Sequence, residues 1–510
     1  MPDHSLQQPR LALLFLTLAA LACSRSDQPI VVFGIELRGS PGGSGAKVPP
    51  DSPESSAPEI VEIPYLTPTP DPIREAPPPQ EIPEWYTVRP GDSLNIIAGR
   101  MGIGVNQIMA ANGLANADFL GVGQVLWLPT PIPQPAGPSF KIIPDAELVN
   151  GPTGAAFDTF ALIAVWDGAL HRYRETMNGG ELTGAQIVQW VAETYSVNPR
   201  LLVALLEYQG GWLTQPVAPP ERLTYPLGFA RTGYEGLYRQ LAWAADQLNR
   251  AYYLWRAGWA GPYILADGTA VNPGPGINAG TAAVQSLFGQ LYPSEIWRGV
   301  ADDNGFYRVY EILFGVPFSR APDPLLPEGL LQPELQLPFE PGRVWSFTGG
   351  PHASWGNWAA WAALDFAPPG EALGCVLSNE WVVAVADGLI VRSADGEVMQ
   401  DLDGDGLEGT GWVIQYLHIE TRDRILDGAR LSAGDRIGHP SCEGGVSSGT
   451  HTHISRKYNG EWIPADGNLP FVMDGWVSAG SGSPYDGTLS RDGIHLEACS
   501  CRFSINQVSR

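Results

Sequence analysis

Residues 447–454 read SSGTHTHI and lie in the last third of the chain. Its two histidines, His451 and His453, stand at positions i and i+2, so in a strand both side chains lie on the same face of the sheet. Short runs of β-forming residues bounded by turns surround the stretch: 382–385, 388–391 and 412–416. We therefore expect a mostly antiparallel β domain over residues 341–475.

Three more polar side chains of this region can join the pair. His418 follows an apolar run, Asp365 lies between apolar neighbours, and His352 follows a Gly-Pro turn. The chain has only eight histidines, so four of them in one β domain indicate a shared site rather than coincidence. A catalytic zinc site needs three nitrogen or oxygen ligands and a water, with a further group to move protons. The sequence contains such a set.

The region resembles the lysostaphin-type zinc peptidases. The matching segments occur in the order of that family: AALDFAP, VVAVADGLI, VIQYLHI, LSAGDRIG and SSGTHTHI. Position by position, the resemblance implies that His352, Asp365 and His453 bind Zn2+. It also implies that His418 and His451 are the two histidines beside the metal that activate water and stabilise charge on the tetrahedral intermediate.

One feature departs from that family. Twelve residues separate His352 from Asp365, where the family usually has fewer. We expect the extra residues to loop out, so that both ligands are kept. The insertion contains Trp355, Trp358 and Trp361, which either line a substrate groove or pack in the ordinary way, and packing is the interpretation that we favour.

The beginning of the chain reads as an export signal. Arg10 precedes an apolar run, 11–21, that is too short to cross a bilayer as a mature helix, and small residues precede Cys23. This pattern resembles a bacterial lipoprotein signal, 1–22, which implies that the thiol of Cys23 carries a lipid. An ordinary secretory signal is the alternative. We therefore predict an extracytoplasmic protein of the cell envelope, lipid-anchored to the membrane.

Residues 85–130 are expected to form a small domain. The stretch YTVRPGDSLNIIAGRMGIGVNQIMAANGLANADFLGVGQVLWLP resembles the LysM module over its whole length. The resemblance implies a βααβ fold that binds N-acetylglucosamine chains of peptidoglycan or chitin, with a groove beside Gly91, Asp92 and Ser93. Turn and helix-cap chemistry accounts equally well for these three residues.

Residues 155–315 read as an all-α domain. Two segments, YSVNPRLLVALLEYQGGW and INAGTAAV, resemble motifs of lysozyme-like lytic transglycosylases. Those enzymes end the first helix with a catalytic glutamate, but Gln209 stands here, and a carboxamide cannot protonate a leaving group at a useful rate. Glu207 lies on a different side of that helix. We therefore expect an inactive relative that holds glycan or acts as a spacer.

Proline-rich composition separates these parts. Residues 23–84 contain few aromatic residues and read as a disordered tether. Shorter linkers are expected at 131–154 and 316–340. Residues 476–510 are assigned to a C-terminal extension that contains a cysteine pair.

The four cysteines after Cys23 suggest disulfides, because their number is even and the compartment is oxidising. Three pairings are possible, of which we favour Cys375 with Cys442 and Cys499 with Cys501.

An acidic segment resembles the start of a calcium loop. It offers oxygen donors from Asp401, Asp403, Asp405 and Glu408. EF-hand spacing would require an acid where Trp412 stands. An acidic hairpin turn is therefore the alternative to a Ca2+ site.

Composition excludes some classes of function. A net charge of −24 argues against a nucleic-acid partner, and 510 residues exceed what one hydrophobic core normally serves. The sequence predicts a zinc-dependent endopeptidase that hydrolyses peptide cross-links of peptidoglycan and is held at the wall by its LysM module. The alternative is a non-catalytic envelope lipoprotein that scaffolds or activates cell-wall amidases. The presence of every ligand type favours the enzyme.

Overall fold

The computed structural model describes these residues: 85–89, 92–101, 103–117, 120–129, 135–177, 180–258, 261–320, 324–355, 360–370 and 373–510. The predicted lipidation site Cys23, the tether and Gly91 lie outside the described residues, as does Trp358. Among the described helices, none is both long enough and apolar enough to span a bilayer.

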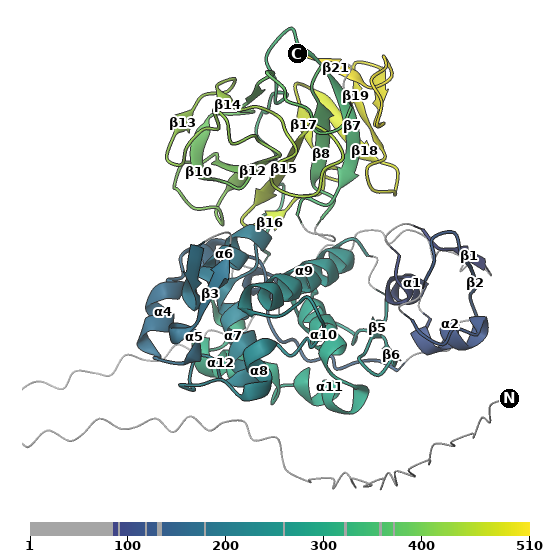
Figure 1. Ribbon diagram of the computed structural model, residues 1–510, viewed down its shortest axis with the longest axis vertical. Helices are drawn as coiled ribbons and strands as arrows, with labels where there is room; N and C mark the ends of the chain where they lie inside the picture. The colour runs from purple at the N-terminus through teal and green to yellow at the C-terminus, as the bar shows by residue number, and fades with distance from the viewer. Residues whose placement is uncertain are drawn as a thin grey trace, which may run out of the picture. The chain divides into compact units, whose positions relative to one another are not determined.

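The first described part has the predicted strand–helix–helix–strand order (Figure 1). Strand β1 (Trp85–Thr87) pairs antiparallel with β2 (Val125–Trp127), and α1 (Leu94–Met101) and α2 (Val105–Asn112) lie between them in sequence. Helix α2 ends at a glycine in the left-handed conformation, which lacks the steric penalty of a side chain there. The core of this first part includes apolar side chains from all four elements: Tyr86, Leu94, Ile97, Ile108 and Leu126.

The middle part is mainly helical. Its helices are α3 (Pro152–Ala155), α4 (Thr159–Val165), α5 (Ala169–Arg172), α6 (Gly184–Tyr195), α7 (Pro199–Gly210), α8 (Pro220–Thr224), α9 (Leu237–Arg256), α10 (Ala279–Leu291), α11 (Ser294–Val300) and α12 (Phe306–Phe314), with 3-10 turns at Asp145–Glu147 and Pro317–Ser319. Helices α9 and α10 lie side by side and bury their apolar faces (Figure 1). Local sequence explains α7, because Asn198 caps its first turn, accepting the N–H of Arg200 at 3.0 Å, and Pro199 suits its first position.

Two predictions for this part need correction. It is not all-α, since two antiparallel hairpins interrupt the helices: β3 (Arg174–Met177) with β4 (Gly180–Thr183), and β5 (Tyr263–Ile264) with β6 (Ala270–Val271). The predicted linker 131–154 is also part of the fold from about its middle onward. Ile142, Ile143 and Leu148 are fully buried in the helical core, because they supply apolar surface that the helices cover.

The last part is a β domain with a nine-stranded antiparallel sheet. Eight of its strands follow the order β13-β10-β11-β12-β15-β8-β7-β21, and the ninth, β16, pairs with β15. The strands are β7 (Val344–His352), β8 (Ala363–Ala367), β10 (Gly388–Ala394), β11 (Glu397–Asp401), β12 (Trp412–Leu417), β13 (Arg430–Leu431), β15 (Thr452–Tyr458), β16 (Glu461–Trp462) and β21 (Gln507–Ser509). A short pair, β9 (Val382–Val383) with β14 (Arg436–Gly438), accompanies it. The core contains stacked Phe339 and Trp345, with ring centroids 5.0 Å apart.

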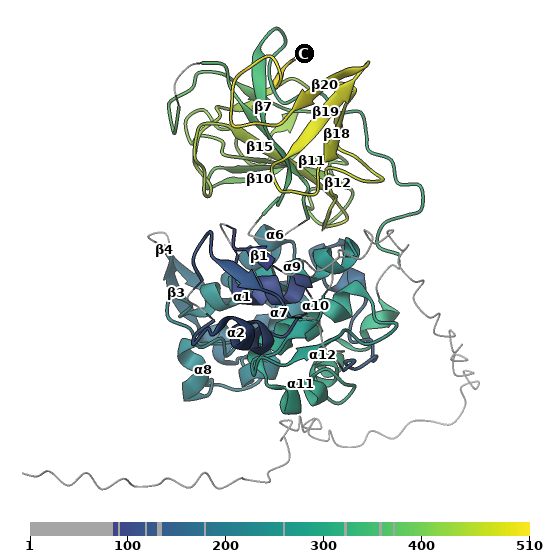
Figure 2. The same ribbon diagram turned by 90° about the vertical axis from the view of Figure 1, so that its right-hand side faces the viewer.

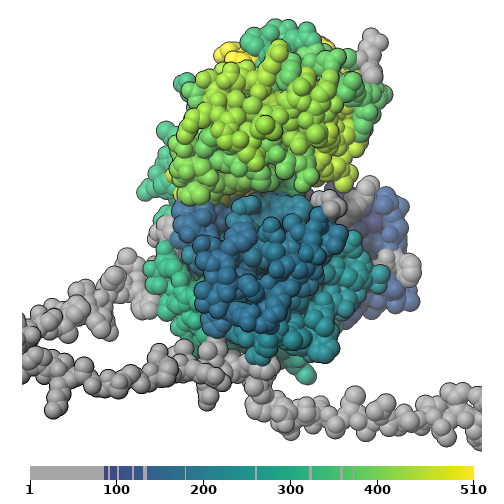
Figure 3. All heavy atoms as spheres, turned by 60° about the vertical axis from the view of Figure 1, so that its left-hand side comes forward, coloured from purple at the N-terminus to yellow at the C-terminus, as the bar shows by residue number. Residues whose placement is uncertain are grey.

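Residues 476–510 belong to this β domain, contrary to the predicted extension. Strands β17 (Val472–Met473), β18 (Trp476–Gly480), β19 (Gly487–Arg491) and β20 (Ile494–Glu497) form a second sheet that contacts β7 (Figure 2). Strand β21 then pairs with β7 itself. Leu489, Leu496 and Val508 are buried in the same core as the large sheet. In the space-filling view, residues near the C-terminus, coloured yellow, lie at the surface of this domain (Figure 3). These short strands belong to the domain because they bury apolar side chains in its core.

A buried ion network crosses the large sheet. Arg392 on β10 donates two hydrogen bonds to Glu408, at 2.6 and 3.1 Å, and it also contacts Glu397. Lys457 on β15 binds Glu408 at 3.1 Å. Burial by itself would raise the pKa of Glu408, but Arg392 and Lys457 overcome this effect and hold that pKa at about 2. The carboxylate of Glu408 therefore stays charged and pairs with both cations, while Glu397 supplies the second negative charge.

We expect Glu408→Gln to lower the free energy of unfolding by about 3 kcal/mol, since it leaves the buried Lys457 without its carboxylate partner and Arg392 with Glu397 alone. The exposed Asp427→Asn is the matched control, expected to have little effect. Because the folded pKa lies below the unfolded value of 4.5, the contribution of Glu408 is present above that value and is lost as the pH falls towards about 2. Urea unfolding at about pH 7 and about pH 3 should show the difference between wild type and Glu408→Gln shrinking in acid. An equal difference at both pH values would contradict the assignment.

Candidate metal centre

Strand register brings the three predicted metal ligands together. Strand β8 lies between β15 and β7, and Asp365 on β8 is directly opposite His453 on β15. Cross-strand partners have Cβ atoms about 4.5–5.5 Å apart, so the pairing itself places the two side chains in contact. A register shift between Gly349 and His352 at the end of β7 brings His352 to the same place. Gly349 must lack a side chain, because a Cβ there would lie 2.6 Å from Asp365 Oδ2.

The distances between the ligand atoms define a compact cluster. One donor atom from each of His352, Asp365 and His453 lies within 4.8 Å of the other two, and all three residues are buried. His352 Nε2 is 3.3 Å and His453 Nδ1 is 3.2 Å from Asp365 Oδ1. The two nitrogens are 3.0 Å apart.

In the rings of His352 and His453, the nitrogen that points away from the cluster binds a backbone carbonyl, and this contact decides which nitrogen carries the proton. His352 Nδ1 lies 2.8 Å from the carbonyl oxygen of Gly350, and His453 Nε2 lies 3.2 Å from that of Ser354. A carbonyl oxygen only accepts, so these nitrogens carry the protons and the inner nitrogens present lone pairs. Asp365 Oδ1 is buried and has no hydrogen-bond partner among the residues that the structure describes. Three converging lone pairs repel one another unless a cation lies between them, so the donor set fits a divalent metal.

Electrostatics agree with this donor set. Burial alone would raise the pKa of Asp365, but positive charge on the neighbouring His352 and His451 holds it well below its usual range, and a bound cation would have the same effect when these rings are neutral. The carboxylate therefore stays ionised, as a metal ligand must.

The two predicted non-ligand histidines lie beside the cluster. His418 follows β12 with a positive φ of 65°, and its Nδ1 is 2.8 Å from the carbonyl oxygen of Glu443. His451 Nδ1 is 2.8 Å from the carbonyl oxygen of Gly449, and its Nε2 is 3.6 Å from Asp365 Oδ1. The rings of His418 and His451 are 4.4 Å apart. Burial, and then the neighbouring imidazoles, lower the pKa of His418 to about 3, so its ring is neutral and keeps a lone pair for a proton.

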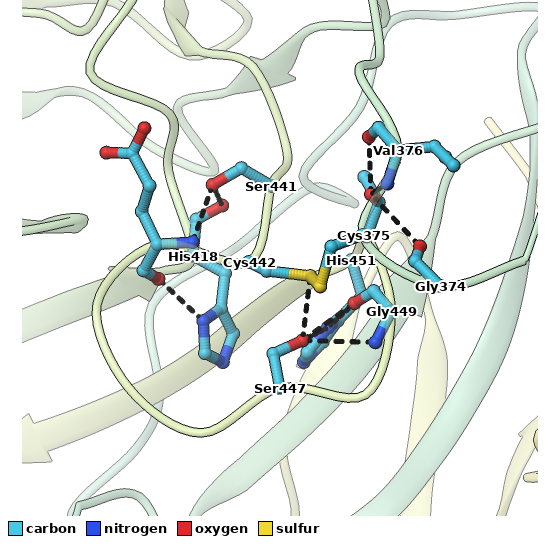
Figure 4. Close-up of a disulfide and its surroundings, with 11 residues drawn as sticks. Gly374, Cys375, Val376, His418, Ser441, Cys442, Ser447, Gly449 and His451 are labelled. Carbon is cyan, nitrogen blue, oxygen red and sulfur yellow. Dashed lines mark hydrogen bonds between the residues drawn. A yellow bond between two sulfur atoms is a disulfide. The ribbon is translucent and has the colours of Figure 1, made fainter.

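A disulfide ties down the loop that carries His451 (Figure 4). The structure pairs Cys375 with Cys442, with their Cα atoms 5.7 Å apart, and Cys499 with Cys501. Ser447 Oγ lies 3.4 Å from the sulfur of Cys442 and 3.3 Å from Nδ1 of His451. The disulfide therefore helps to orient a histidine of the site from outside it.

We expect the double variant Cys375→Ser/Cys442→Ser to lose about 3 kcal/mol of unfolding free energy, because this bridge closes a loop of 67 residues. The matched control is Cys499→Ser/Cys501→Ser, whose bridge spans a separation of 2 and constrains the unfolded chain far less. Urea unfolding of both variants under oxidising conditions makes the measurement. Equal losses in the two variants would exclude loop closure as the cause.

The predicted glycan-binding turn has structural partners. Asp92 Oδ2 accepts the hydroxyl of Tyr86 at 2.7 Å and the N–H of Arg89 at 2.8 Å. Ser93 Oγ accepts the N–H of Ile96 at 3.2 Å and so caps α1. These contacts hold the turn, and they leave the outer face of exposed Ser93 open to solvent.

The predicted calcium ligands separate into two groups. One oxygen from each of Asp401, Asp403 and Asp405 lies within 4.8 Å of the others. Glu408 is bound to Arg392 in the ion network and lies outside this cluster, so the structure does not place it with the other three predicted ligands. The carboxylate of Asp401 accepts backbone N–H groups of its own loop.

Glu207 and Gln209, the two polar residues considered at the end of α7, both make hydrogen bonds within the middle part. Glu207 accepts the N–H groups of Leu213 and Thr214, at 2.9 and 3.1 Å. Gln209 is buried and accepts the hydroxyl of Tyr292 at 2.9 Å. Glu207 therefore fixes the turn after α7.

Sequence reasoning missed one aromatic side chain at the metal centre. The ring of Tyr485 stacks on His352, with centroids 4.2 Å apart and planes 22° from parallel. The backbone carbonyl of Tyr485 accepts the N–H of Gly350 at 2.7 Å, and the backbone N–H of Tyr485 donates to the carbonyl of Pro351 at 3.2 Å. No periodic pattern marks this residue, because it lies in a turn with a positive φ of 67°. Trp355 of the insertion packs edge-on against Tyr195, as the packing interpretation predicts.

Comparisons with known proteins match separate parts of the chain. Residues 86–129 match the LysM domain family, and residues 141–326 match the family described as LasA, N-terminal domain. Protease LasA of Pseudomonas aeruginosa (strain UCBPP-PA14) is 26% identical over 382 residues, which cover 70% of this chain and 84% of that protein.

Two further proteins are similar to about a third of the chain. The beta-lytic metalloendopeptidase of Achromobacter lyticus is 30% identical over 173 residues, which cover 32% of this chain and 42% of that protein. A solved structure described as a novel M23 metalloprotease, pseudoalterin, from deep-sea is 23% identical with a TM-score of 0.29, and the match covers 35% of this chain and 99% of that one. The chain thus joins a LysM domain to a C-terminal metallopeptidase domain of the lysostaphin type.

Proposed function

We propose that this protein is a zinc-dependent endopeptidase that hydrolyses peptide cross-links of peptidoglycan. The observation that carries the proposal is the convergence of three lone pairs, from His352, Asp365 and His453, on one buried point. Two nitrogens and one oxygen are a donor set that suits zinc and leaves a fourth position for water or substrate. The relatives named as protease and metalloendopeptidase support the same class of reaction.

The residues of the site have distinct parts in the proposed mechanism. A zinc ion bound here would polarise the scissile carbonyl and lower the pKa of the attacking water. Asp365 stays ionised and offsets the charge of the ion. His418 and His451 each hold one nitrogen by a backbone carbonyl, so the opposite nitrogen can take a proton from the water and return it to the leaving amine.

Targeting to the wall is the second element of the proposal. The LysM domain supports N-acetylated glycan as the polymer that the protein binds. Linking a binding domain to a hydrolase raises the local concentration of substrate without altering the chemistry.

The decisive experiment uses purified sacculi and the full chain. Incubation should release new amino termini from cross-linked peptides, a zinc chelator should stop the release, and added zinc should restore it. New amino termini in the presence of the chelator would remove the metal from the mechanism. Stimulation of an added wall amidase without any new termini would favour the scaffold alternative instead.

We also infer an extracytoplasmic location with a lipid on Cys23, on the strength of the signal-like sequence before it. The mature protein should begin at Cys23 with the added mass of acyl groups, and Cys23→Ser should release it from membranes. Mass spectrometry of the mature amino terminus makes the measurement, and an unmodified terminus elsewhere would support the ordinary secretory signal.

A further inference from the structure

A hollow of about 600 Å³ lies over α9, outside the metal centre. Four elements of the helical part border it: α9, the loop before α9, α10, and the end of α6 through Tyr195. The start of α1 borders it as well, through Ser93, Asn95 and Ile96. The hollow is therefore lined by both the LysM domain and the helical part.

Helical periodicity places two neighbouring rows of α9 on this hollow, because residues four apart share one side of a helix. One row contains Tyr238, Ala242, Asp246 and Arg250, and the other contains Arg239, Trp243 and Gln247. The face mixes aromatic rings with hydrogen-bonding groups. Such a mixture is typical of a binding site, where apolar surface supplies contact area and a few polar groups set orientation.

Three aromatic side chains that line the hollow, Phe229, Tyr234 and Trp243, pack against one another. Phe229 stacks on Trp243 with ring centroids 4.0 Å apart and planes 6° from parallel, and Tyr234 packs edge-on against Phe229. The fully buried Gln240 fixes this loop by accepting the N–H groups of Leu227 and Phe229 and donating to the carbonyls of Phe229 and Tyr234. Four hydrogen bonds from one buried amide make this aromatic wall rigid before any ligand arrives.

The charge of the lining is opposite to that of the chain. Three arginines and one aspartate border the hollow: Arg231, Arg239, Arg250 and Asp246. The chain as a whole carries a net charge of −24, so a local positive excess selects for an anionic ligand. Gln247 and Gln290, which bond to each other at 2.9 Å, add amide groups that suit hydroxyl and acetamido groups.

We propose that this hollow binds a glycan strand that carries carboxylates, so that the LysM domain and α9 hold one strand together. Sugar rings would lie against Tyr234 and Tyr238, and the carboxylates of attached peptides would meet Arg231 and Arg239. The exposed Ser93, which the LysM resemblance already assigns to glycan, also lines this hollow. The identity of the strand as peptidoglycan rests on the proposed function, but the site itself does not.

Binding of the full chain to two soluble probes tests this site. The probes are peptidoglycan glycan strands stripped of stem peptides, which no endopeptidase can cut, and the same strands with stem peptides attached. Tyr234→Ala should weaken binding of both probes by about tenfold, because it removes a stacking surface. The double variant Arg231→Gln/Arg239→Gln should weaken only the peptide-bearing probe, also by about tenfold. The exposed Arg308→Gln on α12 is the matched control, expected to bind both probes like wild type.

The outcomes separate this proposal from the peptidase. If thermal unfolding shows that Tyr234→Ala is not folded, binding by the Arg231→Gln/Arg239→Gln variant alone tests the site. Unchanged binding of the peptide-bearing probe by the arginine variant, or absence of binding by the wild type, would overturn the site. Hydrolysis of a cross-linked peptide that lacks glycan reports on the proposed function separately. Its absence, with glycan binding intact, would remove the peptidase and leave this site standing.

Discussion

Replacing His453 with alanine is expected to empty the metal centre and to abolish hydrolysis of wall peptides. The variant leaves two donors, His352 and Asp365, which are too few for a catalytic zinc site. Zinc measured after dialysis should fall from about one ion per chain to near zero. The rate of release of new amino termini should fall by at least about 10³-fold, because polarisation of the carbonyl and activation of water are lost together.

A histidine elsewhere in the same domain provides the matched control. His495 lies exposed on β20, where its ring bonds to Ser490 Oγ at 2.8 Å. His495→Ala should keep both zinc and activity. His451 is the nearest substitute donor, since its Nε2 is 3.6 Å from Asp365 Oδ1. Residual zinc in His453→Ala that disappears in the double variant with His451→Ala would show that His451 takes over as the third ligand. Full zinc and full activity in the single variant would place the metal centre elsewhere.

Local periodicity made part of the site predictable. Two histidines two positions apart in a β-forming stretch must share a face if the stretch is a strand. The structure has a strand, β15, that contains His453 opposite Asp365 of β8, whereas His451 immediately precedes this strand and forms a separate bridge with Ser441. An acid between apolar residues in the middle of a strand is costly to bury without a cation or a donor, so Asp365 could also be singled out from sequence.

Other parts of the site depend on contacts that no local pattern encodes. The inner nitrogens of His352 and His453 meet across 101 positions of the chain. The carbonyl of Ser354, which fixes the ring of His453, comes from the insertion between two ligands, and a backbone carbonyl has no signature in sequence. Tyr485 reaches His352 from a turn that periodicity does not describe.

Domain boundaries failed for a related reason. Proline-rich composition predicted linkers, but Ile142 and Ile143 are buried in the helical core, and Leu337 and Phe339 in the β core. A few apolar residues within a polar segment are enough to attach it to a core, because each buried large side chain contributes about 1.5–3 kcal/mol. Composition averaged over a segment does not show such anchors.

Replacing His418 or His451 with alanine is expected to slow hydrolysis by about 10²–10⁴-fold while the zinc content stays that of wild type. Neither ring is among the three donors that converge, and each uses one nitrogen on a backbone carbonyl. Loss of a proton-transfer group lowers kcat, whereas loss of a ligand lowers kcat and metal content together. The pair of measurements therefore separates the two roles that the sequence assigned to four similar imidazoles.

Ser447→Ala provides the matched comparison for His451. Ser447 Oγ lies 3.3 Å from His451 Nδ1 and touches no converging ligand atom, so its removal should loosen the orientation of the ring and lower kcat by less than tenfold, about one hydrogen bond. Zinc content should be unchanged in this variant as well. Zinc loss in His451→Ala alone would make that residue a ligand, and it would then follow that the proton must be handled by His418, whose neutral ring is the remaining base beside the cluster.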